Sequence, residues 1–352
     1  MAFILSTMQY IDIAIVGAGP AGAVLAAGCA AAGMRVLLFD HRAPWEKPCG
    51  GMLGPGAFEE FGFSREYPRP VCFSTALRCT GPRSNEAIRP SERPFPVLSR
   101  RDLGEYLIDR AVRCGARFVS GRIVRLDRGK TGWSLGTGES AYAARLVAGA
   151  DGVRSMVRAR VAAPIPRPHR SLCCGYTVEG ARPEHPLIRC EDLRGYLWLF
   201  DRGTRQSAGI LSRMGDLGVT ALFARLNDFL AREHPSARAV SRYAALIPSV
   251  RDPAFFDLPC AGDDWLLVGD AAAHVDPLTG EGIRYALAGA RCAADSLIDD
   301  TPRSYDESWR AAFGGLLRAK ASRLARMDAL ADAFGAEMYG AMLHAHFAGA
   351  GG

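Results

Sequence analysis

Three short groups of glycine and acidic residues stand in one order along the chain, and their residue types suit the binding of phosphates and sugars. The groups are Gly17-Ala18-Gly19-Pro20-Ala21-Gly22, Ala150-Asp151-Gly152 and Val268-Gly269-Asp270. Glycine lets the backbone approach a phosphate closely, and a carboxylate accepts hydrogen bonds from hydroxyl groups. Together the three groups predict a cradle for a flavin dinucleotide.

The first group lies between a predicted strand and a predicted helix. Residues 12–16 are a β-branched apolar run, and the residues after the glycines are almost all Ala, Gly and Leu. In this context Gly17 permits the tight turn, Gly19 admits a pyrophosphate, and Gly22 allows the helix to pack on the strand. The helix amino terminus then supplies N–H donors and the positive end of its dipole to the phosphates.

A second predicted strand, residues 35–39, ends at Asp40. This acid lies near the spacing after Gly22 that is expected for the carboxylate that binds a ribose 2′-hydroxyl. Asp40 and the adjacent His41 are therefore assigned to the cofactor. A carboxylate at this place disfavours a 2′-phosphate, which argues against NADP as the resident dinucleotide.

The order of predicted elements indicates two interleaved domains. Buried-strand patterns that alternate with helices, the last strand running from Trp265 to Asp270, predict a Rossmann-like α/β domain that binds FAD. Pro-rich stretches with alternating apolar patches predict an inserted antiparallel β-sheet domain for the substrate. The FAD-binding domain is expected from residues 1–67, 98–163 and 260–335, the substrate domain from 68–97 and 164–259, and a carboxyl-terminal tail from 336–352.

An apolar stripe at helical spacing lies near the carboxyl terminus, at Leu324, Met327, Ala331, Phe334 and Met338. We expect this stripe to pack on the rest of the fold, although its pattern also suits a lipid surface. Membrane contact is not predicted on this pattern alone.

Composition excludes several classes of protein. The 352 residues are 49% hydrophobic, no apolar stretch approaches about 20 residues, and the amino terminus has no basic signal region, so a cytoplasmic protein is expected. The ten cysteines form no Cys-x-x-Cys pair, which predicts reduced thiols and no metal site. The net charge is +6, but the basic residues are dispersed, which argues against nucleic-acid binding.

Two further segments indicate a family. Lys47-Pro48-Cys49-Gly50-Gly51 resembles the Pro-Cys-Gly-Gly loop of geranylgeranyl reductases, with Met52 where a third glycine is common. Residues 196–200, Tyr-Leu-Trp-Leu-Phe, resemble the Tyr-x-Trp-x-Phe-Pro strand of the same branch, with Asp201 in place of the proline. Over nearly its full length the chain resembles the flavoprotein superfamily of para-hydroxybenzoate hydroxylase, and within it the geranylgeranyl reductase branch.

The resemblance implies the roles of several residues. It implies that Asp151 and Gly152 lie against the dinucleotide, and that Gly269 and Asp270 bind its ribityl or pyrophosphate region. An arginine that meets the pyrophosphate is expected at Arg100, with Arg101 as the alternative. The Pro-Cys-Gly-Gly loop, Cys49, Gly50 and Gly51, is expected near the flavin ring, and the substrate cavity is expected to be lined by Tyr196, Trp198 and Phe200.

Residues 269–283 form the most specific segment, since they combine a carboxylate, the fixed Pro277 and two glycines that open a helix. Asp270 can accept a hydroxyl of the cofactor's sugar-alcohol chain. Backbone amides at the helix start can stabilise the electron-rich side of a reduced flavin. These amides are expected at Gly280, Glu281, Gly282 and Ile283.

Two enzymatic reactions are compatible with this pattern. In a reductase, reduced flavin gives a hydride to one carbon of a C=C bond in an apolar substrate, and an acid protonates the other; Cys49 and Tyr196 are the candidate acids. In a monooxygenase, a C4a-hydroperoxyflavin transfers oxygen to an electron-rich, for example aromatic, substrate. The loop at Cys49 favours the reductase. A non-catalytic flavin-binding protein is the third alternative.

His274 is a further candidate for acid–base catalysis, because related hydroxylases carry Gly-Asp-Ala-Ala-His. Here Ala273 displaces the histidine by one position. No separate nicotinamide-binding domain is apparent in the sequence. The external electron donor is therefore expected to be NAD(P)H that binds transiently or an electron-carrier protein.

Overall fold

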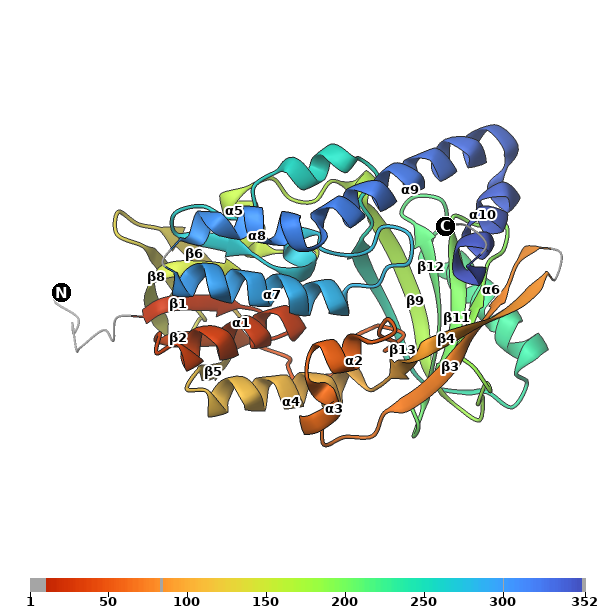
Figure 1. Ribbon diagram of the computed structural model, residues 1–352, viewed down its shortest axis with the longest axis horizontal. Helices are drawn as coiled ribbons and strands as arrows, with labels where there is room; N and C mark the ends of the chain where they lie inside the picture. The colour runs from red at the N-terminus through yellow and green to blue at the C-terminus, as the bar shows by residue number, and fades with distance from the viewer. Residues whose placement is uncertain (1–10, 83–84, 300, 350–352) are drawn as a thin grey trace.

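The structure, a computed structural model, describes residues 11–82, 85–299 and 301–349, and its strands form two sheets (Figure 1). Sheet A has the order β5-β2-β1-β8-β7-β6, and β14 pairs with the carboxyl-terminal part of β8. Its strands are β1 (Ile11–Val16), β2 (Val36–Asp40), β5 (Arg117–Ser120), β6 (Arg125–Arg128), β7 (Trp133–Gly136), β8 (Ala141–Gly149) and β14 (Trp265–Leu267).

The central strands of sheet A are parallel, which places their functional turns together. β1 pairs in parallel with β2 and β8, and β14 pairs in parallel with β8. The side chains of β1 are almost all buried, as expected for a strand covered on both faces. Because carboxyl ends of parallel strands meet at one edge, the turns at Gly17, Asp40, Asp151 and Gly269 lie along the same edge of the sheet.

Helix α1 packs against strands β1 and β2 and lies beside α4 and α7, while α5 contacts β6, β8 and β14. α1 and α7 pack closely, since a Cβ on Gly28 would lie 2.7 Å from Ala294 Cβ. The helices are α1 (Pro20–Ala31), α2 (Ala57–Glu60), α3 (Phe63–Glu66), α4 (Arg100–Arg113), α5 (Met156–Val161), α6 (Val219–Glu233), α7 (Ile283–Ile298), α8 (Tyr305–Trp309), α9 (Gly315–Phe334) and α10 (Ala336–Ala348). No helix of the described chain combines the length and the apolar character needed to traverse a bilayer.

Sheet B is antiparallel except where β10 pairs with β3, and its order is β13-β9-β12-β11-β10-β3-β4. One face packs against α6 and the other against α9 and α10. The proline-rich strand β4 lies at the sheet edge, where missing N–H donors are tolerated. The strands are β3 (Cys72–Thr80), β4 (Glu86–Val97), β9 (Arg170–Glu179), β10 (Leu187–Arg189), β11 (Gly195–Asp201), β12 (Gln206–Arg213) and β13 (Arg238–Pro248).

α9 links the two halves of the molecule, and α10 turns back against sheet B (Figure 1). On α9 the buried Asp328 accepts a hydrogen bond from Arg251 Nε at 2.7 Å. The chain reverses at Gly335, whose φ of +92° suits glycine. Residues 336–348, expected as part of a tail, thus form a packed helix.

The fold class predicted from the sequence is confirmed: a mixed α/β dinucleotide-binding half is combined with an antiparallel sheet. Two local predictions were wrong. The strand from Trp265 ends at Leu267 rather than Asp270, because residues 269–272 form a 3-10 turn that starts with Gly269 at φ +60°. The apolar stripe is buried as far as Ala331, but Phe334 is 69% exposed, since α9 ends there.

Candidate functional site

A cleft of about 550 Å³ runs along the carboxyl edge of sheet A and reaches β13 of sheet B. The glycine turn, the ends of β2 and β8, the start of α4 and the 3-10 turn after β14 all contribute to its wall. Residues predicted from the sequence that line the cleft are Gly17, Gly19, Pro20, Ala21, Asp40, His41, Arg100, Asp151, Gly152, Gly269 and Asp270. Segments far apart in the sequence thus meet around one elongated space.

The three glycines of the first turn have different surroundings. A Cβ on Gly17, whose φ is +102°, would lie 2.3 Å from Ala150 O, so this glycine joins the first motif to the second. A Cβ on Gly22 would lie 1.9 Å from Gly17 O, which explains how the helix packs against the turn. No atom lies within 4 Å of the Cβ position of Gly19. Gly19 therefore leaves the cleft open at the helix amino terminus, where a phosphate would bind.

Asp40 organises the end of β2. One carboxylate oxygen accepts the N–H of Ala18 at 2.9 Å, and the other accepts the N–H groups of Arg42 and Ala43 at 2.8 and 3.0 Å. These bonds hold the carboxylate at the cleft wall. A carboxylate has about four lone-pair sites, so Asp40 retains capacity for a sugar hydroxyl.

Two buried polar atoms at the cleft have no hydrogen-bond partner within the part of the chain that the structure describes. Arg100 is 8% exposed and its Nε is unpaired, and Asp151 Oδ1 is also unpaired, whereas Asp151 Oδ2 accepts the N–H of Met156 at 2.7 Å. Burial raises the pKa of Asp151. Because unpaired buried polar groups are costly, these atoms suit the polar groups of a bound ligand. Arg101 is exposed, so Arg100 is the arginine of the cleft.

These features suit the binding of FAD, because an open helix amino terminus, an unpaired guanidinium nitrogen and an unpaired carboxylate oxygen border the same cleft. Sequence reasoning did not identify Lys47 as part of this site. Its Nζ lies 3.1 Å from Asp270 Oδ2, and both residues line the cleft. The ion pair joins the Pro-Cys-Gly-Gly loop to the turn after β14.

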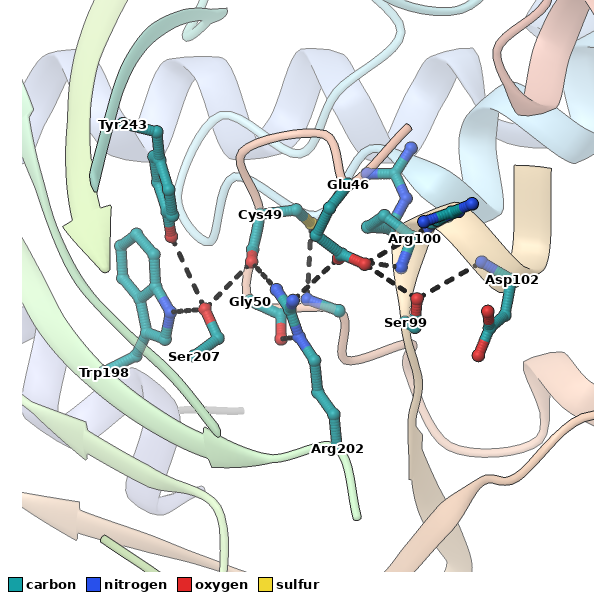
Figure 2. A network of polar contacts seen from close by, with 12 residues as sticks. Glu46, Cys49, Gly50, Ser99, Arg100, Asp102, Trp198, Arg202, Ser207 and Tyr243 are labelled. Carbon is teal, nitrogen blue, oxygen red and sulfur yellow. Dashed lines mark hydrogen bonds and ion pairs between the residues drawn. The ribbon is translucent and has the colours of Figure 1, made fainter. Parts of the chain in front are cut away.

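The aromatic strand β11 meets this loop directly. A Cβ on Gly50 would lie 2.6 Å from Phe200 Cδ2 and 3.5 Å from Trp198 Nε1, so glycine is required for the contact. Ser207 Oγ donates to Cys49 O at 2.9 Å and accepts from Trp198 Nε1 at 3.1 Å (Figure 2). The two segments that carry the family resemblance therefore touch one another.

Arg202, which follows β11, fastens the same loop and was not identified from the sequence. Its side chain is 5% exposed; Nη1 donates to Glu46 Oε1 at 2.7 Å, Nε donates to Gly50 O at 3.1 Å, and Nη2 donates to Cys49 O (Figure 2). Glu46 also accepts from Ser99 Oγ at 2.7 Å. A clue existed in the sequence, since an arginine follows the aromatic strand, but its partners could not be inferred.

The same network places charge around Cys49. Glu46 accepts the N–H of Arg100 at 3.0 Å, which holds the first turn of α4 beside the loop. Burial raises the pKa of the Cys49 thiol, but the Arg100 guanidinium, the Gly51 N–H at 3.3 Å from Sγ and the Arg202 guanidinium outweigh it, so that the pKa is lower than usual. A thiol in such surroundings releases a proton readily.

The segment 276–283 links the cleft region to the aromatic strand. Tyr196 donates its hydroxyl proton to Thr279 O, and a Cβ on Gly280 would lie 3.7 Å from the Tyr196 hydroxyl oxygen. Glu281 Oε1 accepts the N–H of Gly54 at 2.8 Å, and burial raises the pKa of Glu281. Burial also raises the pKa of Tyr196 well above its usual value.

Several predicted residues do not line the cleft itself. Gly22 lies behind the turn, whereas Cys49, Gly50 and Gly51 adjoin the cleft through Lys47 and Arg100. The other predicted residues outside its wall are Pro277, Gly280, Glu281, Gly282, Ile283, Tyr196, Trp198 and Phe200. The aromatic side chains instead belong to an apolar cluster with α9 and α10.

The structure does not bring His274 to the cleft. This residue is fully buried, its ring centroid is 4.4 Å from that of Trp309, and burial lowers its pKa to about 3. The extra residue Ala273, which has φ +61°, displaces the histidine by one position relative to the Gly-Asp-Ala-Ala-His motif. A neutral imidazole enclosed by aromatic rings is part of the core, so the catalytic role predicted for His274 has no geometric support.

Known proteins resemble this chain over most of its length. A family model described as an FAD binding domain matches residues 10–179. The geranylgeranyl diphosphate reductase of Rhodobacter capsulatus is 34% identical over 312 residues, which cover 83% of this chain and 75% of that protein. Digeranylgeranylglycerophospholipid reductase 1 of Methanopyrus kandleri is 30% identical over 335 residues, which cover 86% of each chain.

The fold has a counterpart among solved structures. A geranylgeranyl bacteriochlorophyll reductase-like protein from Thermoplasma acidophilum superposes with a TM-score of 0.81 at 20% identity, covering 96% of this chain and 91% of that one. At this identity the likeness concerns the fold. It includes both sheets, since nearly the whole chain is superposed.

Proposed function

The chain belongs to the geranylgeranyl reductase family of FAD-dependent oxidoreductases, and from this premise we propose that it adds two hydrogen atoms across a C=C bond of an apolar, prenyl-type substrate. The observation that carries the proposal is the contact of the Cys49–Gly50 loop with the aromatic strand β11, beside the dinucleotide cleft. Relatives are named for geranylgeranyl diphosphate and for digeranylgeranylglycerophospholipid, which are prenyl compounds.

The residues of the cleft divide the binding of FAD among them. Gly19 and the amino terminus of α1 would hold the pyrophosphate, together with the Arg100 guanidinium. Asp40 and Asp151 would accept hydrogen bonds from hydroxyl groups of the dinucleotide, and Asp270 would accept one from the ribityl chain. Bound FAD, reduced by an external donor such as NAD(P)H or an electron-carrier protein, supplies the hydride for one carbon of the double bond.

Cys49 supplies the proton for the other carbon. The S–H bond breaks as the new C–H bond forms, and the electron pair stays on sulfur as a thiolate. Arg100, Arg202 and the Gly51 N–H stabilise this thiolate, which agrees with the lowered pKa of the thiol. A proton from water then restores the thiol. An unactivated alkene needs such an acid because its carbons are poor electrophiles.

Tyr196, the second candidate acid, is assigned to the wall of the substrate site instead. Its hydroxyl proton is committed to Thr279 O, and its raised pKa makes it a weaker acid than Cys49. Together with Trp198 and Phe200 it offers aromatic surface to an apolar chain. The amides at the start of α7, Gly280 to Ile283, are proposed to stabilise negative charge on the reduced cofactor.

Anaerobic single turnover tests this function. FAD-loaded protein is reduced by light and mixed with geranylgeranyl diphosphate, and flavin reoxidation and product mass are followed. We expect reoxidation together with a product that has gained two hydrogens, and loss of both in Cys49→Ala. Cys114→Ala is the matched control, because this half-buried cysteine at the end of α4 lies outside the cleft.

Other results would assign another function. A product that gains oxygen only in air would identify a monooxygenase. Tightly held flavin that transfers electrons to neither substrate nor oxygen would identify a non-catalytic flavin-binding protein. Either result contradicts the reductase.

A further inference from the structure

The aromatic face of β11 is covered by the last helix of the structure. On α10 the buried side chains Tyr339, Leu343 and Phe347 recur every four residues and so share one face. Phe347 meets Tyr196 edge to face, with ring centroids 5.3 Å apart. Trp198 belongs to the same apolar cluster. α10 therefore fills a slot over the aromatic face of β11, which an apolar substrate chain would have to enter in order to contact this strand.

α10 packs on sheet B through apolar side chains. It is joined to α9 by the single residue Gly335, at φ +92°. The polar bond from Arg89 Nη1 to Phe347 O is long, at 3.5 Å. Apolar contact is not directional, so an apolar chain laid along the roughly 20 Å of this helix would meet the same side chains.

Beside this slot the corner between α9 and α10 exposes large apolar side chains. Leu330 is 40% exposed, Phe334 69% and Met338 41%. Such side chains are costly in water when they lie together. The exposed corner is continuous with the buried cluster, since Met327 and Ala331 on the same helix and Tyr339 on α10 belong to that cluster.

The charges near the corner complement an anionic lipid surface. Arg323, Arg326, Leu330 and Phe334 follow one another at spacings of three, four and four residues, so the four lie along one side of α9. No ion pair to either arginine occurs among residues 11–82, 85–299 and 301–349. The acid Asp332 is neutralised by Arg194. An apolar tip followed by cations along a helix suits insertion into the headgroup boundary.

We propose that the corner formed by Leu330, Phe334 and Met338 docks on an anionic lipid surface, and that the substrate's apolar chain passes from that surface along the slot now filled by α10. The passage rests on the proposed function, whereas the docking does not. The lipid surface is favoured over a second copy of the chain because the apolar corner is flanked by unpaired cations and adjoins an apolar slot.

Sedimentation with vesicles tests the docking. Wild-type protein is mixed with vesicles of phosphatidylcholine, with or without phosphatidylglycerol. We expect binding that increases with phosphatidylglycerol and falls about tenfold or more in the Phe334→Asp/Met338→Asp variant, since two apolar side chains lose their burial. Val112→Asp is the control, because Val112 is also an exposed apolar residue of a helix, at 48%. Arg323→Gln and Arg326→Gln should each reduce binding to anionic vesicles about fivefold.

Three results would contradict docking of the corner on a lipid surface or assign the corner to another partner. Wild-type protein that does not sediment with vesicles, or a double variant that binds as well as Val112→Asp, overturns the docking. A wild-type dimer that the Phe334→Asp/Met338→Asp variant separates, without vesicle binding, assigns the corner to a second copy. Circular dichroism and FAD content verify that each variant is folded.

Hydrogen exchange and two forms of substrate test the passage along α10. Vesicles that contain a prenyl lipid should accelerate amide exchange in residues 336–348 and leave α6 unchanged; unchanged exchange overturns the passage. The double variant should reduce dissolved prenyl substrate normally and vesicle-borne substrate at least tenfold more slowly. If wild-type protein reduces neither substrate, the proposed function fails, while sedimentation still decides the docking.

Discussion

The side chain of Arg202 attaches the loop that contains Cys49 to sheet B, and replacing it by glutamine should weaken this attachment. The guanidinium donates to Glu46 Oε1 at 2.7 Å and Gly50 O at 3.1 Å, and also to Cys49 O (Figure 2). Glutamine is shorter and uncharged, so it cannot replace all three bonds. The variant should therefore lose stability and, because one nearby cation is removed, show a higher pKa for the Cys49 thiol.

The size of the effect follows from the burial of the two partners. Breaking a fully buried ion pair costs roughly 3–5 kcal/mol. The Arg202 side chain is 5% exposed, but that of Glu46 is 35% exposed and keeps the Ser99 hydroxyl at 2.7 Å. We therefore expect the free energy of unfolding to fall by about 2–3 kcal/mol. The Arg202→Gln/Glu46→Gln double variant should show a coupling of about 1–2 kcal/mol.

Urea unfolding of the FAD-saturated protein measures the stability, and the pH dependence of thiol alkylation measures the pKa, with Cys49→Ser as the background. Arg205→Gln is the matched control: Arg205 lies three residues further on, is 52% exposed and pairs with Glu179, so its loss should change stability by less than about 0.5 kcal/mol. The reasoning is refuted if Arg202→Gln resembles Arg205→Gln in stability, or if the Cys49 pKa does not rise.

Three further changes have definite expected outcomes. In single turnover the proton-dependent rate should fall as pH rises through the lowered pKa of Cys49, and Cys49→Ser should remove that dependence and slow the reaction about 10²-fold or more; an unchanged pH profile would exclude the thiol as acid. Gly19→Ala, with open space at its Cβ position, should remain folded and bind FAD about tenfold more weakly. Gly22→Ala, whose new Cβ would lie 1.9 Å from Gly17 O, should instead lower the melting temperature markedly. Flavin fluorescence measures FAD binding and thermal unfolding measures stability, and equal behaviour of the two variants would contradict the assignment. His274→Phe should retain the wild-type turnover rate. Because the pKa of His274 is about 3 in the folded protein and 6.5 in the unfolded chain, the free energy of unfolding of the wild type should fall by several kcal/mol between pH 6.5 and pH 3. The variant should lose that part of the pH dependence, which is measured by following unfolding at a series of acidic pH values.

The dinucleotide cleft was largely predictable because its determinants are local in sequence. The turn at Gly17 and Gly19 stands between a strand and a helix that follow one another directly, so spacing alone indicates the phosphate site. The position of Asp40 follows from the next strand. By contrast, Arg202 and Glu46 are 156 residues apart; Glu46 lies in the loop after β2 of sheet A, Arg202 follows β11 of sheet B, and no periodicity relates them. For His274 the motif suggested chemistry, whereas the structure surrounds its ring with aromatic side chains of the core.

For the aromatic strand β11, one feature followed from the sequence pattern and another only from the tertiary structure. Alternation correctly placed Trp198 and Phe200 on one face of β11, because successive side chains of a strand point to opposite faces. It could not indicate that α10 covers this face, since that contact depends on the chain reversal at Gly335.

The sequence by itself determined the cofactor class, the strand–turn–helix cradle and the alternating faces of the sheets, because each depends on residue types only a few positions apart. Only the tertiary structure decided which charges surround the Cys49 thiol, that His274 is buried among aromatic rings and what covers the aromatic strand. Those features arise from contacts between distant segments, whose free energy is gained only when burial brings them together.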